Sequence, residues 1–128
     1  MRILIVDDVE ANGAIMKRLA MKVFGGEICI ATSGITAVRA CHEAFHDLII
    51  TDYMMPDIDG LAMVSIVRSF TEYRRVPIIM TSADHDVALL SRASRAGVDD
   101  FLPKPINSEM FRKKIVHYLS MRPTSFAA

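Results

Sequence analysis

The chain has 128 residues, of which 52% are apolar and 23% are charged, so it can form one compact domain with a substantial core. Lysine plus arginine and aspartate plus glutamate number 15 each, and this balance provides no overall field that would attract nucleic acid or anionic lipid. The apolar start is too short for a signal peptide and no run is long enough to span a membrane, so we expect a cytoplasmic domain that binds neither membrane nor nucleic acid directly.

Five short runs typical of β-strands alternate with longer segments of helical periodicity. The candidate strands are residues 3–6, 28–31, 48–51, 76–81 and 98–102. The first, third and fourth are almost continuously apolar, as expected for parallel strands that are covered by helices on both faces. Short right-handed connections then predict an α/β fold: a five-stranded parallel sheet in a doubly wound (βα)5 flavodoxin-like three-layer sandwich.

The segments between the strands carry apolar residues at the spacing of amphipathic helices. These residues are Ala14, Ile15, Leu19 and Val23, then Ile35, Val38 and Ala44, then Leu61, Val64 and Val67, then Val87, Leu90 and Ala93, and finally Phe111, Ile115 and Leu119. Ser33 and Asn107 fit N-caps of the second and last helices, and Gly25 and Gly97 fit the ends of the first and fourth. We expect residues 1–122 to form the domain and residues 123–128 to be a tail or the start of a linker.

Polar residues occur where the predicted strands end. Asp7 and Asp8 follow the first strand, Asp52 the third, Ser82 the fourth and Lys104 the fifth, and a parallel sheet brings these positions to one edge. Each alone fits a turn, a helix cap or a solvated loop. Together, the three carboxylates require a cation, and hard oxygen ligands favour Mg²⁺ over zinc or copper. A carboxylate nucleophile, a metal, a hydroxyl and a lysine meet the needs of phosphoryl transfer.

Four segments of the chain resemble the signature motifs of the receiver domains of two-component response regulators, in particular those of the chemotaxis-regulator type. They are Val6-Asp7-Asp8, Asp52-Tyr53-Met54-Met55-Pro56-Asp57-Ile58-Asp59-Gly60, Met80-Thr81-Ser82-Ala83 and Leu102-Pro103-Lys104-Pro105. The resemblance extends over nearly the whole chain. It implies a signalling switch that catalyses only its own phosphorylation and dephosphorylation and has no small-molecule substrate of its own.

By this resemblance, Asp52 is the residue phosphorylated by a histidine kinase or a phosphotransfer protein. Asp8 and Asp52 would bind Mg²⁺ through their carboxylates, Met54 through its main-chain carbonyl and Asp7 through water. The resemblance further implies that Met54 and Asp84, two positions beyond the phosphoacceptor and the switch hydroxyl, influence the lifetime of the phosphoryl group.

The same resemblance implies a set of switch residues. Ser82, followed by the small residue Ala83, would be the switch hydroxyl, Phe101 the switch aromatic and Lys104 the phosphoryl-binding lysine, which precedes a cis peptide bond to Pro105. Movement of the hydroxyl and inward rotation of the ring would alter the surface of the fourth helix, fifth strand and fifth helix. An output domain, a downstream protein or a second copy in a homodimer would bind there.

Three assignments near this pocket remain open on the sequence. Thr81 competes with Ser82 for the hydroxyl role, and Ser82 is preferred because a small residue follows it and because it precedes Lys104 by 22 residues. Phe101 also fits an ordinary core position. His85 fits either the rim of the pocket or a solvated loop.

One motif supports a different function. His42, Glu43 and His46 match H-E-x-x-H, the pattern of a zinc hydrolase, with Glu72 as a candidate third ligand. The predicted strand at residue 48 leaves His46 at the end of its helix, where cationic side chains are favoured without any metal. A receiver-shaped interaction module that is never phosphorylated is a further alternative, although the complete acidic set argues against it.

The cysteines, the basic residues of the last helix and three of the methionines fit structural roles. Cys29 and Cys41 lack metal or redox spacing and are expected to be reduced core residues. The basic residues 112–114 fit a solvated helix face, and Met16 and Met63, like Met80, fit core positions.

Overall fold

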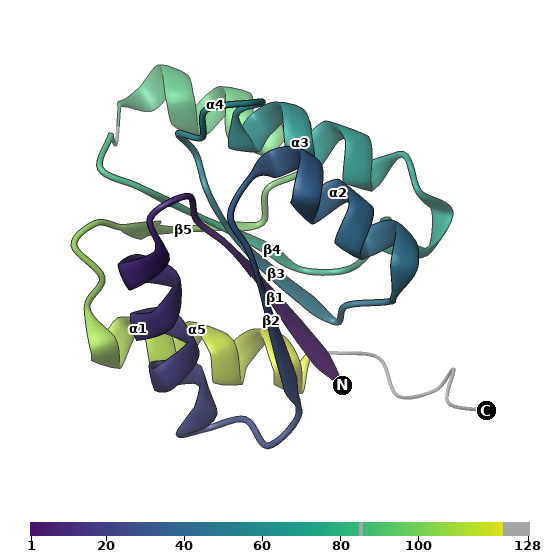
Figure 1. Cartoon of the computed structure of the whole chain (residues 1–128). Coiled ribbons are helices and arrows are strands. Elements are labelled where there is room, and N and C mark those ends of the chain that lie inside the picture. Colours follow the sequence, from purple (N-terminus) through teal and green to yellow (C-terminus); the bar gives the residue numbers. More distant parts are fainter. Residues whose placement is uncertain (85, 122–128) are drawn as a thin grey trace.

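In the computed structural model, which describes residues 1–84 and 86–121, a parallel sheet lies between two layers of helices (Figure 1). The strands are β1 (Arg2–Val6), β2 (Glu27–Ala31), β3 (Leu48–Asp52), β4 (Ile78–Ser82) and β5 (Asp100–Pro103). The helices are α1 (Glu10–Met21), α2 (Gly34–Glu43), α3 (Gly60–Arg68), the 3-10 helix η1 (Thr71–Tyr73), α4 (Val87–Ala96) and α5 (Ser108–Ser120). The predicted tail at residues 123–128 lies outside the described residues. None of the described helices is both long and apolar enough to cross a membrane.

The five parallel strands have the order β2-β1-β3-β4-β5, which confirms the predicted doubly wound fold. Figure 1 shows α1 and α5 on one face of the sheet and α2, α3 and α4 on the other. The chain crosses from one face to the other beside β1 and β3, and loops diverge beyond the carboxyl ends of these strands. This is the edge at which the polar residues were expected to meet.

Two apolar cores lie on the two faces of the sheet because adjacent residues of a strand point in opposite directions. Leu4 and Ile49 belong to the core beneath α2, α3 and α4, whereas Ile3 and Ile50 belong to the core beneath α1 and α5. The predicted core methionines Met16, Met63 and Met80 are all buried. Both cysteines are free, with Cys41 buried and Cys29 half-buried.

The predicted N-caps are confirmed. The side chain of Ser33 accepts a hydrogen bond from the amide of Thr36, and that of Asn107 accepts one from the amide of Met110. Gly97 ends α4 in the left-handed conformation with φ 111°, which glycine adopts without steric cost.

The predicted end of the first helix at Gly25 is wrong. Helix α1 ends at Met21 because the amides of Lys22 and Val23 bond to carbonyls three residues back, which tightens the chain out of the α-helical path. The last strand is also displaced from the predicted residues 98–102. The amide of Val98 still bonds to Ala93 at the end of α4, so that pairing in β5 begins only at residue 100.

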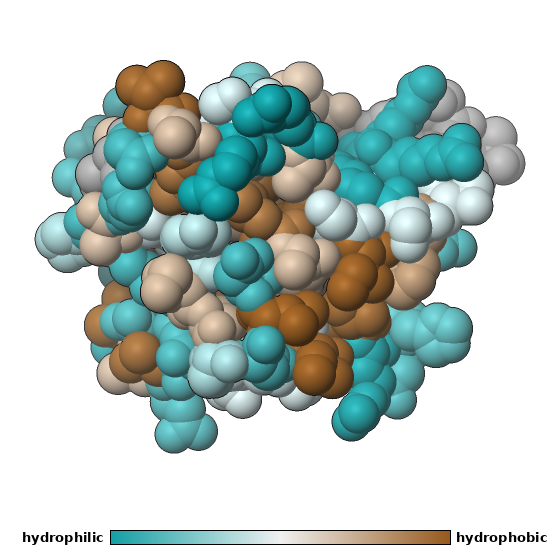
Figure 2. Space-filling view, turned by 90° about the horizontal axis from the view of Figure 1, so that it is seen from above, coloured by the Kyte–Doolittle hydropathy of each residue, from teal (hydrophilic) through white to brown (hydrophobic). Residues whose placement is uncertain are grey.

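The buried faces of three helices differ from the predicted apolar stripes. Ile15, Ile35 and Val87 are exposed by 48%, 52% and 80% respectively. Small residues are buried in α1 and α2 in their place, namely Gly13 and Ala20 in α1 and Ala37 in α2, whereas α4 buries Leu89 together with the predicted Ala93. Small side chains allow these helices to approach the strands closely, and the larger apolar residues are displaced to the flanks. Figure 2, which looks onto the side of α2, α3 and α4, shows such apolar patches between hydrophilic side chains.

Arg68, the last residue of α3, connects the ends of several elements. Its guanidinium donates hydrogen bonds of 2.6 to 3.1 Å to main-chain oxygens of Tyr73, Val76 and Gly97, and one of 2.9 Å to the carboxylate of Asp99. Asp99 also accepts a hydrogen bond from the amide of Ile78, the first residue of β4. This cluster therefore joins α3, η1, β4 and α4 at the edge of the sheet opposite the acidic residues.

Candidate functional site

Three carboxylates meet at the carboxyl ends of β1 and β3. Asp52 is the last residue of β3, and Asp7 and Asp8 directly follow β1, its neighbour in the sheet. One oxygen from each of the three lies within 4.8 Å of the others, with Asp7 and Asp52 buried and Asp8 exposed. Among residues 1–84 and 86–121, no other group of three metal-binding side chains comes together in this way.

Main-chain amides orient the two buried carboxylates. Oδ1 of Asp7 accepts a hydrogen bond of 2.9 Å from the amide of Val9, and Oδ1 of Asp52 accepts one of 2.8 Å from the amide of Tyr53. The approach of α3 requires a glycine here, because a Cβ atom at Gly60 would overlap the main-chain oxygen of Asp52. In both aspartates the second oxygen, Oδ2, remains available for a cation.

Lys104 provides that cation. Its Nζ lies 3.1 Å from Oδ2 of Asp7 and 3.1 Å from Oδ2 of Asp52, and its side chain is only 20% exposed. The main chain of Lys104 is fixed as well, because its amide donates a hydrogen bond of 3.0 Å to the carbonyl of Ser82 at the end of β4. The peptide bond between Lys104 and Pro105 is cis.

The charges of this site are incompletely balanced. Burial raises the pKa of Asp52, and the Asp7 carboxylate adds to that shift, although Lys104 opposes it. Burial acts to lower the pKa of Lys104, but its contacts with Asp52 and Asp7 outweigh burial and raise that pKa. The single ammonium of Lys104 thus offsets only part of the negative charge of the three carboxylates. A further cation would relieve the remaining repulsion, and an all-carboxylate donor set suits a hard divalent ion.

The predicted switch residues lie on β4, on β5 and in the loop after β4. Ser82 ends β4 nearly buried, and its Oγ accepts a hydrogen bond of 3.0 Å from the amide of Asp84. Thr81 is fully buried, and its Oγ1 has no hydrogen-bond partner within the described part of the chain. Ala83 is exposed beyond the strand, and Phe101 is half-buried against the core beneath α2, α3 and α4.

Comparison with known proteins identifies the family. Residues 3–116 match the sequence model of the response regulator receiver domain. The chain belongs to this family. As a receiver domain it is a signalling switch of two-component systems, and the predicted resemblance is confirmed.

Individual relatives agree with this assignment. The chemotaxis protein CheY of Pseudomonas aeruginosa is 30% identical over 115 residues, which cover 90% of this chain and 93% of that protein. The crystal structure of a two-component response regulator from Clostridium difficile superposes with a TM-score of 0.87 at 26% identity, covering 94% of this chain and 97% of that one. Chemotaxis protein CheY4 of Vibrio cholerae gives a TM-score of 0.86 at 26% identity, with coverage of 91% and 97%. The receiver domain is thus of the CheY-like type.

The predicted modulators of the receiver domain lie at the rim of the site. The side chain of Met54 is 68% exposed in the loop after β3, and Asp84 is exposed in the loop after β4. His85, for which two interpretations were open, lies outside the described residues.

The geometry of the H-E-x-x-H segment rules against the zinc hydrolase. Helix α2 ends at Glu43, so His46 lies beyond the helix and the two histidines do not share a helical face. His42 is exposed, with its ring centroid 6.2 Å from that of Phe70. His46 is buried, and its amide donates a hydrogen bond of 2.9 Å to the hydroxyl of Tyr73. The contacts of both histidines are therefore those of structural residues, and the two do not form a metal site.

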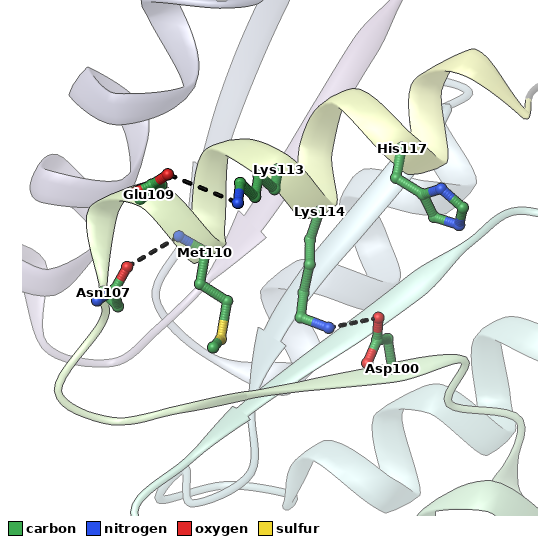
Figure 3. Close-up of a pocket in the computed structure, with 7 residues that line it drawn as sticks. All are labelled: Asp100, Asn107, Glu109, Met110, Lys113, Lys114 and His117. Atoms are coloured by element: carbon green, nitrogen blue, oxygen red, sulfur yellow. Dashed lines mark hydrogen bonds and ion pairs between the residues drawn. The ribbon is translucent and has the colours of Figure 1, made fainter.

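The basic segment of α5 is only partly the solvated face that was predicted. Lys114 is half-buried and lies 2.7 Å from Oδ2 of Asp100, which also accepts a hydrogen bond of 2.9 Å from the hydroxyl of Tyr118. Burial alone would raise the pKa of Asp100, but these two partners and the amide of Phe101 lower it. Figure 3 shows Lys114 reaching from α5 toward Asp100. Both residues line a pocket of about 540 Å³. The contact ties α5 to β5 next to Phe101.

Sequence reasoning missed two residues because their partners are main-chain groups. Arg68 bonds to carbonyls, and Asp57 bonds to amides at the start of α2. Such partners leave no pattern of complementary side chains in the sequence.

Proposed function

We propose that this receiver domain accepts a phosphoryl group on Asp52 from a histidine kinase or phosphotransfer protein in the cytoplasm. The observation that supports this most directly is the position of the Lys104 ammonium, 3.1 Å from both Asp7 and Asp52, with Asp8 completing the acidic cluster. A structural ion pair would need one carboxylate beside the lysine. Three carboxylates, of which two are buried, leave an excess of negative charge that a metal-dependent phosphoryl site requires.

The chemistry follows from these groups. A carboxylate oxygen of Asp52 attacks the phosphorus of a phosphohistidine, and a P–O bond forms as the P–N bond breaks. The electron pair of the P–N bond remains on the imidazole nitrogen of the donor. Lys104 neutralises an oxygen of the transferred group, and the hydroxyl of Ser82 donates a hydrogen bond to another.

The donor set fits Mg²⁺, with Asp8, Asp52 and the main-chain carbonyl of Met54 as direct ligands and Asp7 acting through water. When bound, Mg²⁺ supplies positive charge that offsets the carboxylates and the phosphoryl oxygens. Met54 and Asp84 are exposed in the loops after β3 and β4, and we expect them to influence how long the phosphoryl group persists.

Phosphorylation would change the surface through Ser82 and Phe101. The hydroxyl of Ser82 exchanges the amide of Asp84 for the phosphoryl group, and the half-buried ring of Phe101 turns inward into the vacated space. The surface of α4, β5 and α5 would then bind an output domain, a downstream protein or a second copy of the chain. Ala83 lies beside the moving hydroxyl, where its small side chain leaves room for the phosphoryl group.

The test is phosphorylation by acetyl phosphate in the presence of Mg²⁺, followed by intact-protein mass spectrometry. Wild type should gain one phosphoryl group, and Asp52→Asn should gain none. Asp59→Asn is the matched control: it removes a nearby charge, while asparagine still caps α3 through the amide of Ala62. Uptake by Asp52→Asn, or none by wild type, would contradict the proposal and in the second case favour an interaction module that is never phosphorylated.

A further inference from the structure

The loop between β3 and α3, residues 53–59, is fixed at its two ends. At its start, the amide of Tyr53 donates a hydrogen bond of 3.1 Å to the carbonyl of Thr81. At its end, Asp59 caps α3, and the amide of Gly60 bonds to the carbonyl of Tyr53 at 2.7 Å. Between these points, Met54 and Met55 make no hydrogen bond to any described residue. Met55 packs against the core beneath α2, α3 and α4, whereas Met54 is 68% exposed, so the main chain at Met54 needs a further anchor.

Asp57 is that anchor. Its Oδ1 accepts a hydrogen bond of 3.1 Å from the amide of Gly34, and its Oδ2 accepts one of 2.8 Å from the amide of Ile35. These are the first two amides of α2, which have no acceptor inside the helix and lie at its positive end. The amide of Ile35 is the main cause that lowers the pKa of Asp57 to about 2.

The residue after Asp57 strengthens this attachment. Ile58 packs against the start of α2, and a Cβ atom at Gly34 would overlap the Ile58 side chain. Helix α2 already has its own N-cap, because the Ser33 side chain accepts the amide of Thr36 at 3.1 Å. The contact of Asp57 is therefore an addition to ordinary capping, and it joins the loop to a helix that precedes it by 23 residues in the chain.

Asp57 does not belong to the acidic cluster, which comprises Asp7, Asp8 and Asp52 among the described residues. Asp57 lies only three positions after Met54, and so short a span reaches at most about 10 Å. With Asp52 held in β3 and Asp57 held on α2, the main chain at Met54 has little freedom. Release of Asp57 would allow this segment to move away from the carboxylates.

We propose that Asp57 is a positioning residue for the metal centre: by tying the loop to the N-terminus of α2, it holds the main-chain carbonyl of Met54 where it can bind Mg²⁺. This inference rests on the proposed function, in which Met54 supplies a metal ligand. It predicts that loss of the Asp57 contact weakens Mg²⁺ binding without removing any ligand.

The experiment is a Mg²⁺ titration of the full chain, followed by the amide NMR signals of Asp8 and Tyr53. Asp57→Ala should raise the dissociation constant for Mg²⁺ about tenfold, at the lower end of the effect of residues that orient metal ligands. Asp59→Asn removes the same charge from the same loop but keeps its cap, and should change the constant less than about twofold because a solvated charge is screened. Asp57→Asn, which keeps one acceptor oxygen, should lie between them.

A second measurement separates positioning from stability. The acetyl phosphate reaction of Asp57→Ala should require more Mg²⁺ for half-maximal rate, while its plateau stays within about twofold of the wild-type plateau. Equal Mg²⁺ constants in Asp57→Ala and Asp59→Asn, or an equal loss of rate at every Mg²⁺ concentration, would overturn the inference. If wild type itself binds no Mg²⁺, the proposed function fails, so the wild-type titration and the variant-to-wild-type ratio test the two claims separately.

Discussion

Replacement of Lys104 by methionine tests the charge balance of the site most directly. The ammonium lies 3.1 Å from an oxygen of Asp7 and from one of Asp52. At an effective dielectric constant of about 20, each contact corresponds to roughly 5 kcal/mol of Coulomb attraction. The cost of removing these charges from water offsets most of this sum, and breaking such a buried pair costs about 3 kcal/mol of unfolding free energy. For a domain of this size, we expect the melting temperature to fall by about 10 °C in EDTA.

Mg²⁺ should reverse part of this loss. A divalent ion can neutralise the carboxylates that Lys104 no longer contacts, so Mg²⁺ should raise the melting temperature of Lys104→Met more than that of wild type. Thermal unfolding by circular dichroism, with EDTA and with Mg²⁺, measures both effects. Lys113→Met is the control, because Lys113 is 68% exposed and its pair with Glu109 contributes at most about 1 kcal/mol.

Lys104→Met should also lose the conformational response to beryllofluoride while binding Mg²⁺ more tightly than wild type. Equal melting temperatures of the variant and wild type in EDTA would refute the calculation of charge balance. Loss of Mg²⁺ binding in step with the beryllofluoride response would show that Lys104 holds the metal centre together and does not act on the phosphoryl group.

Three further changes test other parts of the fold. Arg68→Met should cost about 3 kcal/mol in urea unfolding because several charge-assisted hydrogen bonds to main-chain oxygens are lost, whereas Arg95→Met on the exposed surface of α4 should change stability by less than about 0.5 kcal/mol. Gly60→Ala should destabilise the domain by about 2 kcal/mol and impair the proposed phosphorylation, since the added Cβ would displace the main chain of Asp52; wild-type-like melting would contradict this packing. Burial lowers the pKa of His46 in the folded chain. As the pH falls below about 6.5, the unfolded chain therefore takes up a proton on this histidine before the folded chain does, and the free energy of unfolding should decrease until the pH reaches the folded pKa. The decline should be smaller in His46→Gln than in His42→Gln when melting temperatures are compared across pH.

The sheet and the acidic edge could be predicted from the sequence because their determinants are local. Continuous apolar runs mark strands covered on both faces, and the rule that parallel strands end at one edge brings Asp7, Asp52 and Lys104 together without knowledge of any contact. The distances in the structure agree with that convergence. Their roles in phosphorylation remain predictions that rest on the family and on the charge balance.

Helix faces and loop attachments could not be predicted in the same way. An amphipathic pattern selects the largest apolar residues, and so it placed Ile15 and Ile35 inward, whereas the sheet accepts the glycines and alanines that permit close approach. The attachment of Asp57 to α2 leaves no signal because an exposed aspartate in a loop is ordinary. Both features depend on how elements distant in the sequence fit together.

The attachments of the site suggest how a change at one carboxylate reaches the far edge of the sheet. The side chain of Lys104 contacts residues at the ends of β1 and β3, while its main-chain amide is bonded to Ser82 at the end of β4. A phosphoryl group on Asp52, as proposed above, would add charge to which Lys104 and the hydroxyl of Ser82 would both respond. Because a main-chain hydrogen bond joins Lys104 to Ser82, we expect these two residues to move together. Their joint movement would shift β5, the strand that contains Phe101 and ends directly before Lys104.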